Sequence, residues 1–377
     1  NDLISLSVFG RRRTADPGMR SSQALRTLEL EGAPRERGRC HGQTLGAEIR
    51  QLRRALLAYL ARVSLYAGAL PLFGGLLLLA RSFLPQTPSR LKQEMAALAA
   101  GAQVSPGSVL LLNVIDDLAN STPRCSALAV GEGHTRDGSY LMGRNLDYPL
   151  FVDILARLQM LFLLEPDEGQ ALASLAWPGY VGVCTGINKA GVALAQLSAP
   201  SRDRSLTGMP AALRFRLALE GGASAAAAAD QVLRLPGTIG NNLMLCDARE
   251  AMVLELSARR GARRRPRQGL ITASNHYQSP AMQALKGRFP PRTPYSPLSP
   301  YYFTEAYSQA RDRRLQELAA CRHLAPSDLE IILADEAVAN AGTVVCVVFA
   351  PGERTIWVAR GERPPVNRGP FIAKTLW

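Results

Sequence analysis

Two short apolar runs separated by a glycine-rich turn constrain this chain more than any other feature of its sequence. The first run begins at Cys125, the second ends at the segment from Arg144 to Asp147, and the turn covers residues 131–138. This pattern predicts an antiparallel hairpin that brings both charged side chains back beside the thiol. A nearby guanidinium favours the nucleophilic thiolate, and a carboxylate can hold a cationic base. The hairpin therefore predicts a catalytic site with a cysteine nucleophile.

The net charge of +13 raises the question of a nucleic-acid partner. The densest basic cluster, residues 259–267, lies between apolar runs at residues 252–256 and 270–273 and is expected to be a solvated hairpin loop. Aromatic side chains that could stack on bases are not interleaved with these arginines. We therefore expect no nucleic-acid partner, while attraction to an anionic membrane surface stays open.

The six cysteines lack the paired spacing of a metal site. Cys184, Cys246 and Cys346 lie in apolar, strand-like runs and are expected to be small buried residues. The four histidines form no ligand pattern, and the sequence contains no phosphate-binding loop or dinucleotide fingerprint. The sequence thus predicts neither a metal nor an organic cofactor.

The longest uncharged run, residues 63–80, borders on the length of a transmembrane helix. Pro71 and the glycines that follow it interrupt the run, so the pattern favours a buried pair of helices over residues 55–66 and 77–83. The chain shows no secretory signal pattern. We expect a soluble protein, and the sequence leaves its compartment unassigned.

The segments around Cys125 and Arg144 resemble the N-terminal nucleophile hydrolases of the choloylglycine hydrolase type. Three runs upstream of Cys125 indicate one family within this group: Leu30–Gly38, Met95–Ser105 and Leu110–Asn113. Over about residues 28–365 the chain is similar to the acyl-coenzyme A:6-aminopenicillanic acid acyltransferase family. That family groups autoproteolytic acyltransferases and hydrolases, and it shares a superfamily with acid ceramidase.

The resemblance implies an α+β fold, a four-layer αββα sandwich in which Cys125 begins a central strand. It implies a mainly helical segment over residues 28–124 and a catalytic segment over residues 125–377, together forming one globular domain. Residues 1–27 are expected to be a disordered or processed tail. The superfamily also includes enzymes that hydrolyse lipid amides. A peripheral contact with lipid through residues 55–84 is therefore a further expectation.

The resemblance assigns two further site residues. Asn275 matches the oxyanion-hole asparagine of the superfamily, although an asparagine after a strand is more often a turn or cap residue. Arg311 matches an active-site arginine near the start of a helix that Ser308 is expected to cap. Arg313 and Arg314 are the nearby alternatives, and a solvated helix face is the simpler explanation for all three arginines.

The mechanism implied by this resemblance starts with autoproteolysis between Arg124 and Cys125. The released α-amine titrates near 8 and can take the thiol proton without a histidine. The thiolate then attacks the carbonyl of a small N-acyl amide or acyl thioester while Asn275 holds the oxyanion. Arg144 orients the thiolate, and Asp147 binds the ammonium form of the new N-terminus. Water as the second acceptor gives hydrolysis of a linear amide, and an amine gives acyl transfer.

Several alternatives stay open from the sequence. Arg124 is bulkier than the residue that would most easily take the strained geometry of self-cleavage, and Arg144 with Asp147 could be a surface ion pair. A non-catalytic lipid- or ligand-binding homologue would stay uncut. A basic protein that binds anionic surfaces would keep its binding after Cys125→Ala. The acyl and amine specificity and the oligomeric state are not set by these patterns.

Overall fold

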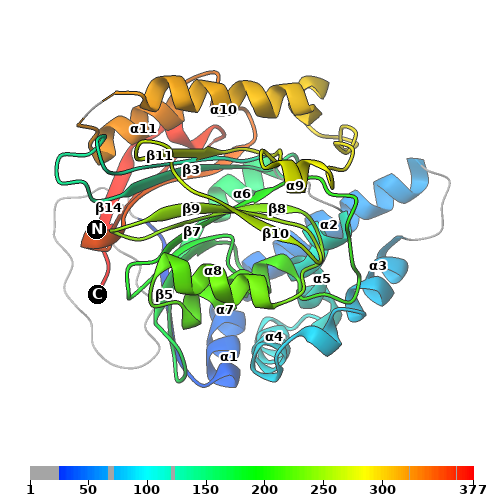
Figure 1. The fold of residues 1–377 in the computed structure, drawn as a ribbon. Coiled ribbons are helices and arrows are strands. Elements are labelled where there is room, and N and C mark those ends of the chain that lie inside the picture. Colours follow the sequence, from blue (N-terminus) through cyan, green and yellow to red (C-terminus); the bar gives the residue numbers. More distant parts are fainter. Residues whose placement is uncertain (1–24, 67–71, 120–123, 322, 362) are drawn as a thin grey trace.

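Two β-sheets lie face to face at the centre of the molecule (Figure 1). The computed structural model describes residues 25–66, 72–119, 124–321, 323–361 and 363–377. The strand order is β1-β4-β5-β6-β7-β8-β9-β10 in the eight-stranded sheet and β11-β2-β3-β12-β13-β14 in the six-stranded sheet. The strands of the eight-stranded sheet are β1 (Thr27–Gly32), β4 (Met160–Pro166), β5 (Leu172–Ala176), β6 (Thr185–Asn188), β7 (Ala193–Ser198), β8 (Asn241–Cys246), β9 (Ala251–Leu256) and β10 (Gly261–Arg264). Those of the six-stranded sheet are β2 (Ser126–Val130), β3 (Leu141–Asp147), β11 (Leu270–Ala273), β12 (Thr343–Ala350), β13 (Thr355–Ala359) and β14 (Phe371–Thr375).

Helices cover the outer face of each sheet, which gives four layers. Figure 1 shows α10 (Glu305–Ala319) and α11 (Pro326–Ala334) over the six-stranded sheet, and α7 (Ala211–Gly221) and α8 (Ala225–Arg234) over the eight-stranded sheet. The other helices are α1 (Pro34–Thr44), α2 (Gly46–Tyr66), α3 (Leu72–Arg81), α4 (Ser89–Ala102), α5 (Pro106–Ala119), α6 (Val152–Leu158) and α9 (Pro280–Gln283). The expected α+β fold, a four-layer αββα sandwich, is confirmed.

Successive side chains of β2 point to opposite faces of the sheet, so alternate residues of this strand lie between the two sheets. Ala127 and Ala129 face the inner core, to which β7 contributes Ala193 and Ala195. Because these side chains are small, the sheets come close enough for β2 and β3 to contact β7 directly. Leu128 faces the other way, into the core beneath α10 and α11. The inner face of β2 is therefore the face at which a side chain can reach β6 and β7.

The hairpin expected from the sequence is present as β2 and β3. The two strands are antiparallel, with Ser126 opposite Asn145 and Val130 opposite Leu141. Cys125 lies immediately before β2, and β11 pairs with the other edge of that strand. The cysteine is thus flanked by the end of β3 on one side and by the segment after β11 on the other.

The described part of the apolar run over residues 63–80 belongs to two helices, and the prediction that this pair is buried holds only in part. α2 begins at Gly46, earlier than expected, and in α3 the fully buried residue is Ala80. Leu65 of α2 is 83% exposed and Leu78 of α3 is 68% exposed. The apolar residues of this pair exceed what packing of α3 on α5 can cover, so part of the apolar surface faces solvent.

The arginine cluster at residues 259–267 is only partly the loop expected from the sequence. Residues 261–264 form β10, an edge strand paired with β9. Charged side chains are common on such edges, where they discourage pairing with another chain. The ion pairs of this cluster are Arg259–Asp203, Arg263–Asp230, Arg264–Glu255 and Arg265–Glu250. Neighbouring acids therefore neutralise much of the cluster's charge.

Most of the tail expected over residues 1–27 lies outside the described residues. Thr27 already belongs to β1, which pairs in parallel with β4. The segment before Cys125 thus adds a strand to the eight-stranded sheet, besides its helices. None of the helices that the structure describes combines the length and apolar character needed to cross a bilayer.

Candidate functional site

Cys125 lies between two arginines that approach it from opposite faces of the six-stranded sheet. Arg144 of β3 contacts its sulfur from the inner face, and Arg311 of α10 contacts its carbonyl oxygen from the outer face. The cysteine side chain is fully buried and lines a cavity. The register of β2 and β3 places Arg144 on the inner face next to Cys125. Helix α10, which covers the outer face of this hairpin, places Arg311 on the other side.

The Arg144 guanidinium is held by the start of β6 and by the interior of β7. Its Nη2 donates to Cys125 Sγ at 3.1 Å and to the carbonyl oxygen of Gln196 at 3.0 Å. Its Nη1 donates to the carbonyl oxygen of Cys184 at 3.0 Å and to the hydroxyl of Thr185. These contacts fix the cation against the sulfur. The sequence did not predict that backbone carbonyls of β7 and of the segment before β6 would accept hydrogen bonds from Arg144. Every residue has such a carbonyl, so the residue types give no indication of which ones are used.

The surroundings of Cys125 disfavour its thiolate, contrary to the expectation from its arginine neighbour. Burial raises the pKa of Cys125, and the opposing effect of Arg144 is too small to cancel it. The Asp147 charge adds to the rise. Arg144 thus acts in the expected direction, but a separate base is required to form the thiolate.

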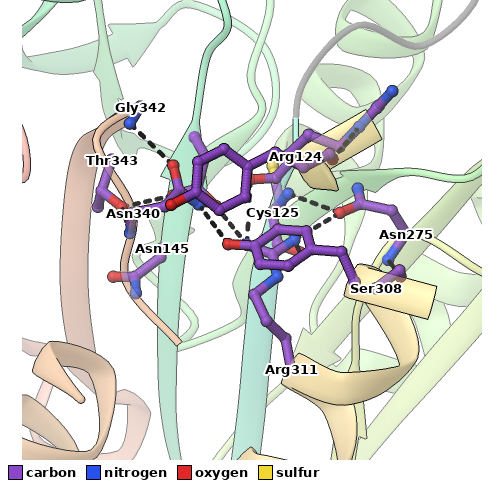
Figure 2. A network of polar contacts seen from close by, with 12 residues as sticks. Arg124, Cys125, Asn145, Asn275, Ser308, Arg311, Asn340, Gly342 and Thr343 are labelled. Atoms are coloured by element: carbon purple, nitrogen blue, oxygen red, sulfur yellow. Dashed lines mark hydrogen bonds and ion pairs between the residues drawn. The ribbon is translucent and has the colours of Figure 1, made fainter. Parts of the chain in front are cut away.

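Arg311 bonds to the groups around Cys125 on the outer face (Figure 2). Its Nη2 donates to the carbonyl oxygen of Cys125 at 2.8 Å and to Asn275 Oδ1 at 2.7 Å, and its Nη1 bonds to Asp147. Burial alone would lower the pKa of Arg311, but Tyr307 and Asp147 raise it above its ordinary value. Arg311 therefore remains cationic although it is fully buried.

Asp147 lies on the outer face of β3, opposite to Arg144. Its carboxylate accepts hydrogen bonds from Thr343 Oγ1 and Asn340 Nδ2, both at 2.7 Å, in addition to the bond from Arg311. Burial raises the pKa of the Asp147 carboxyl, and these three donors oppose the rise. Sequence reasoning missed Asn340 and Thr343. They belong to the polar turn that opens β12, and only the pairing of β12 with β3 brings them to Asp147.

Asn275 follows β11 and lies level with the start of β2. Its Oδ1 accepts the backbone N–H of Cys125 at 2.9 Å, and its Nδ2 donates to the carbonyl oxygen of Ser198 at 2.8 Å. The Asn275 backbone N–H donates to Ser308 Oγ at 2.7 Å. The carboxamide therefore holds the main chain of Cys125 and connects it to β7.

The prediction that Ser308 caps the helix is wrong. Thr304 is the N-cap of α10, because its hydroxyl accepts the Tyr307 N–H at 3.1 Å, while Ser308 lies one turn inside the helix and faces Asn275. Of the three arginines on this helix, Arg311 faces the site. Arg313 is exposed, and Arg314 pairs with Asp335.

The cavity beside Cys125 has a volume of about 400 Å³ and is mainly apolar. Helices α2 and α5 and the loops after β3 and β5 supply most of its wall, including Leu56, Leu60, Ile115, Phe151 and Trp177. The carboxylate of Asp116, which accepts the Tyr148 hydroxyl at 2.8 Å, is among its few charged groups. Among the residues that the structure describes, no cluster of histidine, cysteine or acidic side chains could hold a metal ion.

A sequence model of the acyl-coenzyme A:6-aminopenicillanic acid acyl-transferase family matches residues 134–364. The chain belongs to this family. The match contains Arg144, Asp147, Asn275 and Arg311, and it begins after Cys125. The family's place in the N-terminal nucleophile hydrolase superfamily agrees with the layered fold described above.

Two curated proteins and one solved structure show distant similarity to this family member. An uncharacterized protein of Archaeoglobus fulgidus is 29% identical over 202 residues, which cover 47% of this chain and 33% of that protein. Protein dcd1A of Dictyostelium discoideum is 26% identical over 211 residues, which cover 50% of this chain and 47% of that protein. The aligned region thus spans between a third and about half the length of these relatives. The solved structure of the Caenorhabditis elegans N-acylethanolamine-hydrolyzing acid amidase ortholog is similar at 17% identity and a TM-score of 0.45, over 60% of this chain and 93% of that one.

Proposed function

We propose that this family member is an N-terminal nucleophile amidase or acyltransferase that cuts linear amide C–N bonds through an acyl-enzyme on Cys125. One observation carries the proposal. The Cys125 thiol faces Arg144 and an apolar cavity, while its backbone N–H and carbonyl are held by Asn275 and Arg311. A buried structural cysteine has no need of such contacts on sulfur, nitrogen and oxygen together. Membership of the family supports the same amide chemistry.

Activation is proposed to be self-cleavage between Arg124 and Cys125. Cys125 Sγ attacks the carbonyl carbon of Arg124, whose oxygen accepts a bond from Arg311 Nη1 at 3.4 Å. A C–S bond forms, the C–N bond breaks, and the thiol proton ends on the departing nitrogen of Cys125. Water then hydrolyses this thioester, which restores the thiol and leaves a carboxylate on Arg124. The new α-amine supplies the base that the buried thiol requires.

Turnover is proposed to reuse the same groups. The α-amine takes the thiol proton, the thiolate attacks the substrate carbonyl, and the Asn275 carboxamide stabilises the oxyanion through its Nδ2 group. Arg144 orients the sulfur. Asp147 keeps Arg311 cationic and in place and, through that arginine, helps to hold the new N-terminus. Water or an amine then takes the acyl group, so hydrolysis and acyl transfer differ only in the acceptor.

The cavity supports an apolar acyl group as the half of the substrate that reaches Cys125. A volume of about 400 Å³ accommodates a small aromatic or a medium-length aliphatic acyl chain. Such an acyl group would be supplied as a small N-acyl amide or an acyl thioester, since both present the carbonyl that a thiolate attacks.

The test is the intact mass of the purified wild type together with labelling by 2-cyanobenzothiazole, which condenses with the 1,2-aminothiol of an N-terminal cysteine. We expect two fragments split before Cys125, with the label on the fragment that begins at Cys125. Incubation with an N-acyl amide carrying an apolar acyl chain is expected to add one acyl group to the same fragment. A wild type that stays uncut and unlabelled while hydrolysing amides would contradict the α-amine mechanism.

The exposed leucines of α2 and α3 support a peripheral lipid contact over residues 55–84, because α2 also lines the cavity. We expect the protein to sediment with neutral phosphatidylcholine vesicles. Leu65→Asp combined with Leu78→Asp should weaken this binding by at least about tenfold, since each leucine contributes roughly 1.5–3 kcal/mol when fully buried. Ile331→Asp is the matched control, as this side chain is 71% exposed on α11. Sedimentation with anionic vesicles only, equal for all variants, would instead indicate non-specific charge attraction.

A further inference from the structure

The side chain of Arg124 is buried in a cage of aromatic rings. It is 1% exposed, and its guanidinium carbon lies 5.2 Å from the centroid of the Phe303 ring and 5.7 Å from that of Phe289. Its Nε donates to the carbonyl oxygen of Tyr302 at 3.2 Å. The negative faces of aromatic rings attract cations, and this attraction grows when water is excluded. The cage is therefore matched to a planar cation.

Holding a cation at this position has an energetic cost. Burial, together with the nearby Arg311 charge, lowers the pKa of Arg124 to about 10, so the group stays charged at neutral pH in an environment that disfavours the charge. A leucine or methionine would fill the same volume without that cost. The arginine and its cage thus call for an explanation beyond packing.

The backbone of Arg124 is fixed as firmly as its side chain. Its N–H donates to the carbonyl oxygen of Asp147 at 2.8 Å, and its own carbonyl oxygen accepts from Arg311 at 3.4 Å. On the far side of the peptide, the Cys125 N–H is held by Asn275 Oδ1 at 2.9 Å. The peptide that would be cut is therefore anchored on its nitrogen, on its oxygen and on the side chain of the residue before it (Figure 2).

We infer that the cage of Phe289, Phe303 and the Tyr302 carbonyl is a recognition site for the Arg124 guanidinium that positions the Arg124–Cys125 peptide for self-cleavage. This inference rests on the proposed function, since it concerns its activation step. The cage answers the objection that an arginine is too bulky for this position. Binding of the long side chain in the cage keeps the scissile carbonyl beside Sγ. A smaller residue at this position would lose that binding and would therefore slow self-cleavage.

The test follows the first-order appearance of the two fragments by intact mass after cell-free synthesis of the full chain. Arg124→Gln keeps the planar, polar end but loses the charge, and it should cleave roughly 30-fold more slowly, which corresponds to the loss of a desolvated cation–π interaction. Arg124→Lys keeps the charge and should recover most of the rate. Phe289→Leu removes one ring and should slow cleavage several-fold, whereas Phe289→Tyr, which keeps the ring, should cleave like the wild type.

Arg214 provides the matched control. It is also buried, its pKa is likewise lowered by burial to about 10, and its guanidinium donates to the carbonyl oxygen of Val232 in the helical layer. Arg214→Gln should lower the thermal midpoint without slowing cleavage of the folded chain. Equal cleavage rates for the wild type and Arg124→Gln, or equal slowing by Phe289→Leu and Phe289→Tyr, would overturn the cage while leaving the proposed function intact. A wild type that never cleaves would overturn both.

Discussion

Replacing Cys125 with alanine is expected to give a single uncut chain without amidase activity. The variant loses the sulfur proposed to attack the Arg124 carbonyl, and because its chain should stay joined it should also lack the α-amine proposed as the base. Loss of a nucleophile typically costs on the order of 10⁴-fold or more in rate. On the proposed mechanism, one substitution removes both the nucleophile and the step that creates its base. The measurement is intact mass beside the wild type, followed by an assay with an N-acyl amide.

Cys246→Ala is the control for this experiment. Cys246 is also fully buried between the two sheets, on β8, but it does not line the cavity. This variant should be cut and active like the wild type, with at most a small loss of stability from the missing sulfur. A Cys125→Ala chain that is still split at the same position would mean that another protease, and not this thiol, makes the cut. Retained amidase activity in an uncut Cys125→Ala chain would point to a different nucleophile.

The hairpin and its charges were accessible from the sequence because they depend on local contacts. Register in a hairpin is set by the turn and by the apolar pattern, so Arg144 and Asp147 had to lie near Cys125. What the sequence analysis overlooked is the alternation of the strand. Residues 144 and 147 are an odd number apart and therefore lie on opposite faces of β3. Arg144 reaches the sulfur, while Asp147 acts from the other side through Arg311.

Other parts of the site depend on contacts that no local pattern contains. Asn340 and Thr343 reach Asp147 because β12 pairs with β3, a pairing between segments almost two hundred residues apart. The raised pKa of Cys125 results from burial between two sheets, a quantity set by the whole fold. The true helix cap, Thr304, lies one turn before Ser308, and both residue types are good caps, so propensity could not distinguish them.

Replacing Arg311 with glutamine is expected to have the largest combined effect on stability and cleavage. The Arg311 guanidinium bonds to Asp147, to the carbonyl oxygens of Arg124 and Cys125 and to Asn275, and it is fully buried. Its loss leaves the buried Asp147 carboxylate without a cation, and breaking a buried pair in this way costs about 3–5 kcal/mol in the free energy of unfolding. Self-cleavage should fall by roughly 10²–10³-fold, because the donor to the scissile carbonyl is lost.

The stability lost in the Arg311→Gln variant should depend on pH. Burial raises the pKa of Asp147 even beside Arg311, and without the arginine this pKa should rise further, so above about pH 4 the folded variant keeps a proton that the unfolded chain releases. The variant's free energy of unfolding, measured by urea denaturation, should therefore decrease between pH 5 and 8 more steeply than that of the wild type.

Adding Asp147→Asn to Arg311→Gln removes the unpaired charge and should restore most of the lost stability and abolish this slope. Cleavage should remain slow in the double variant, because the cation that donates to the Arg124 carbonyl oxygen is still missing. If the double variant regained both stability and cleavage, Arg311 would serve only to balance the buried carboxylate, and its contact with the scissile carbonyl would carry no catalytic role.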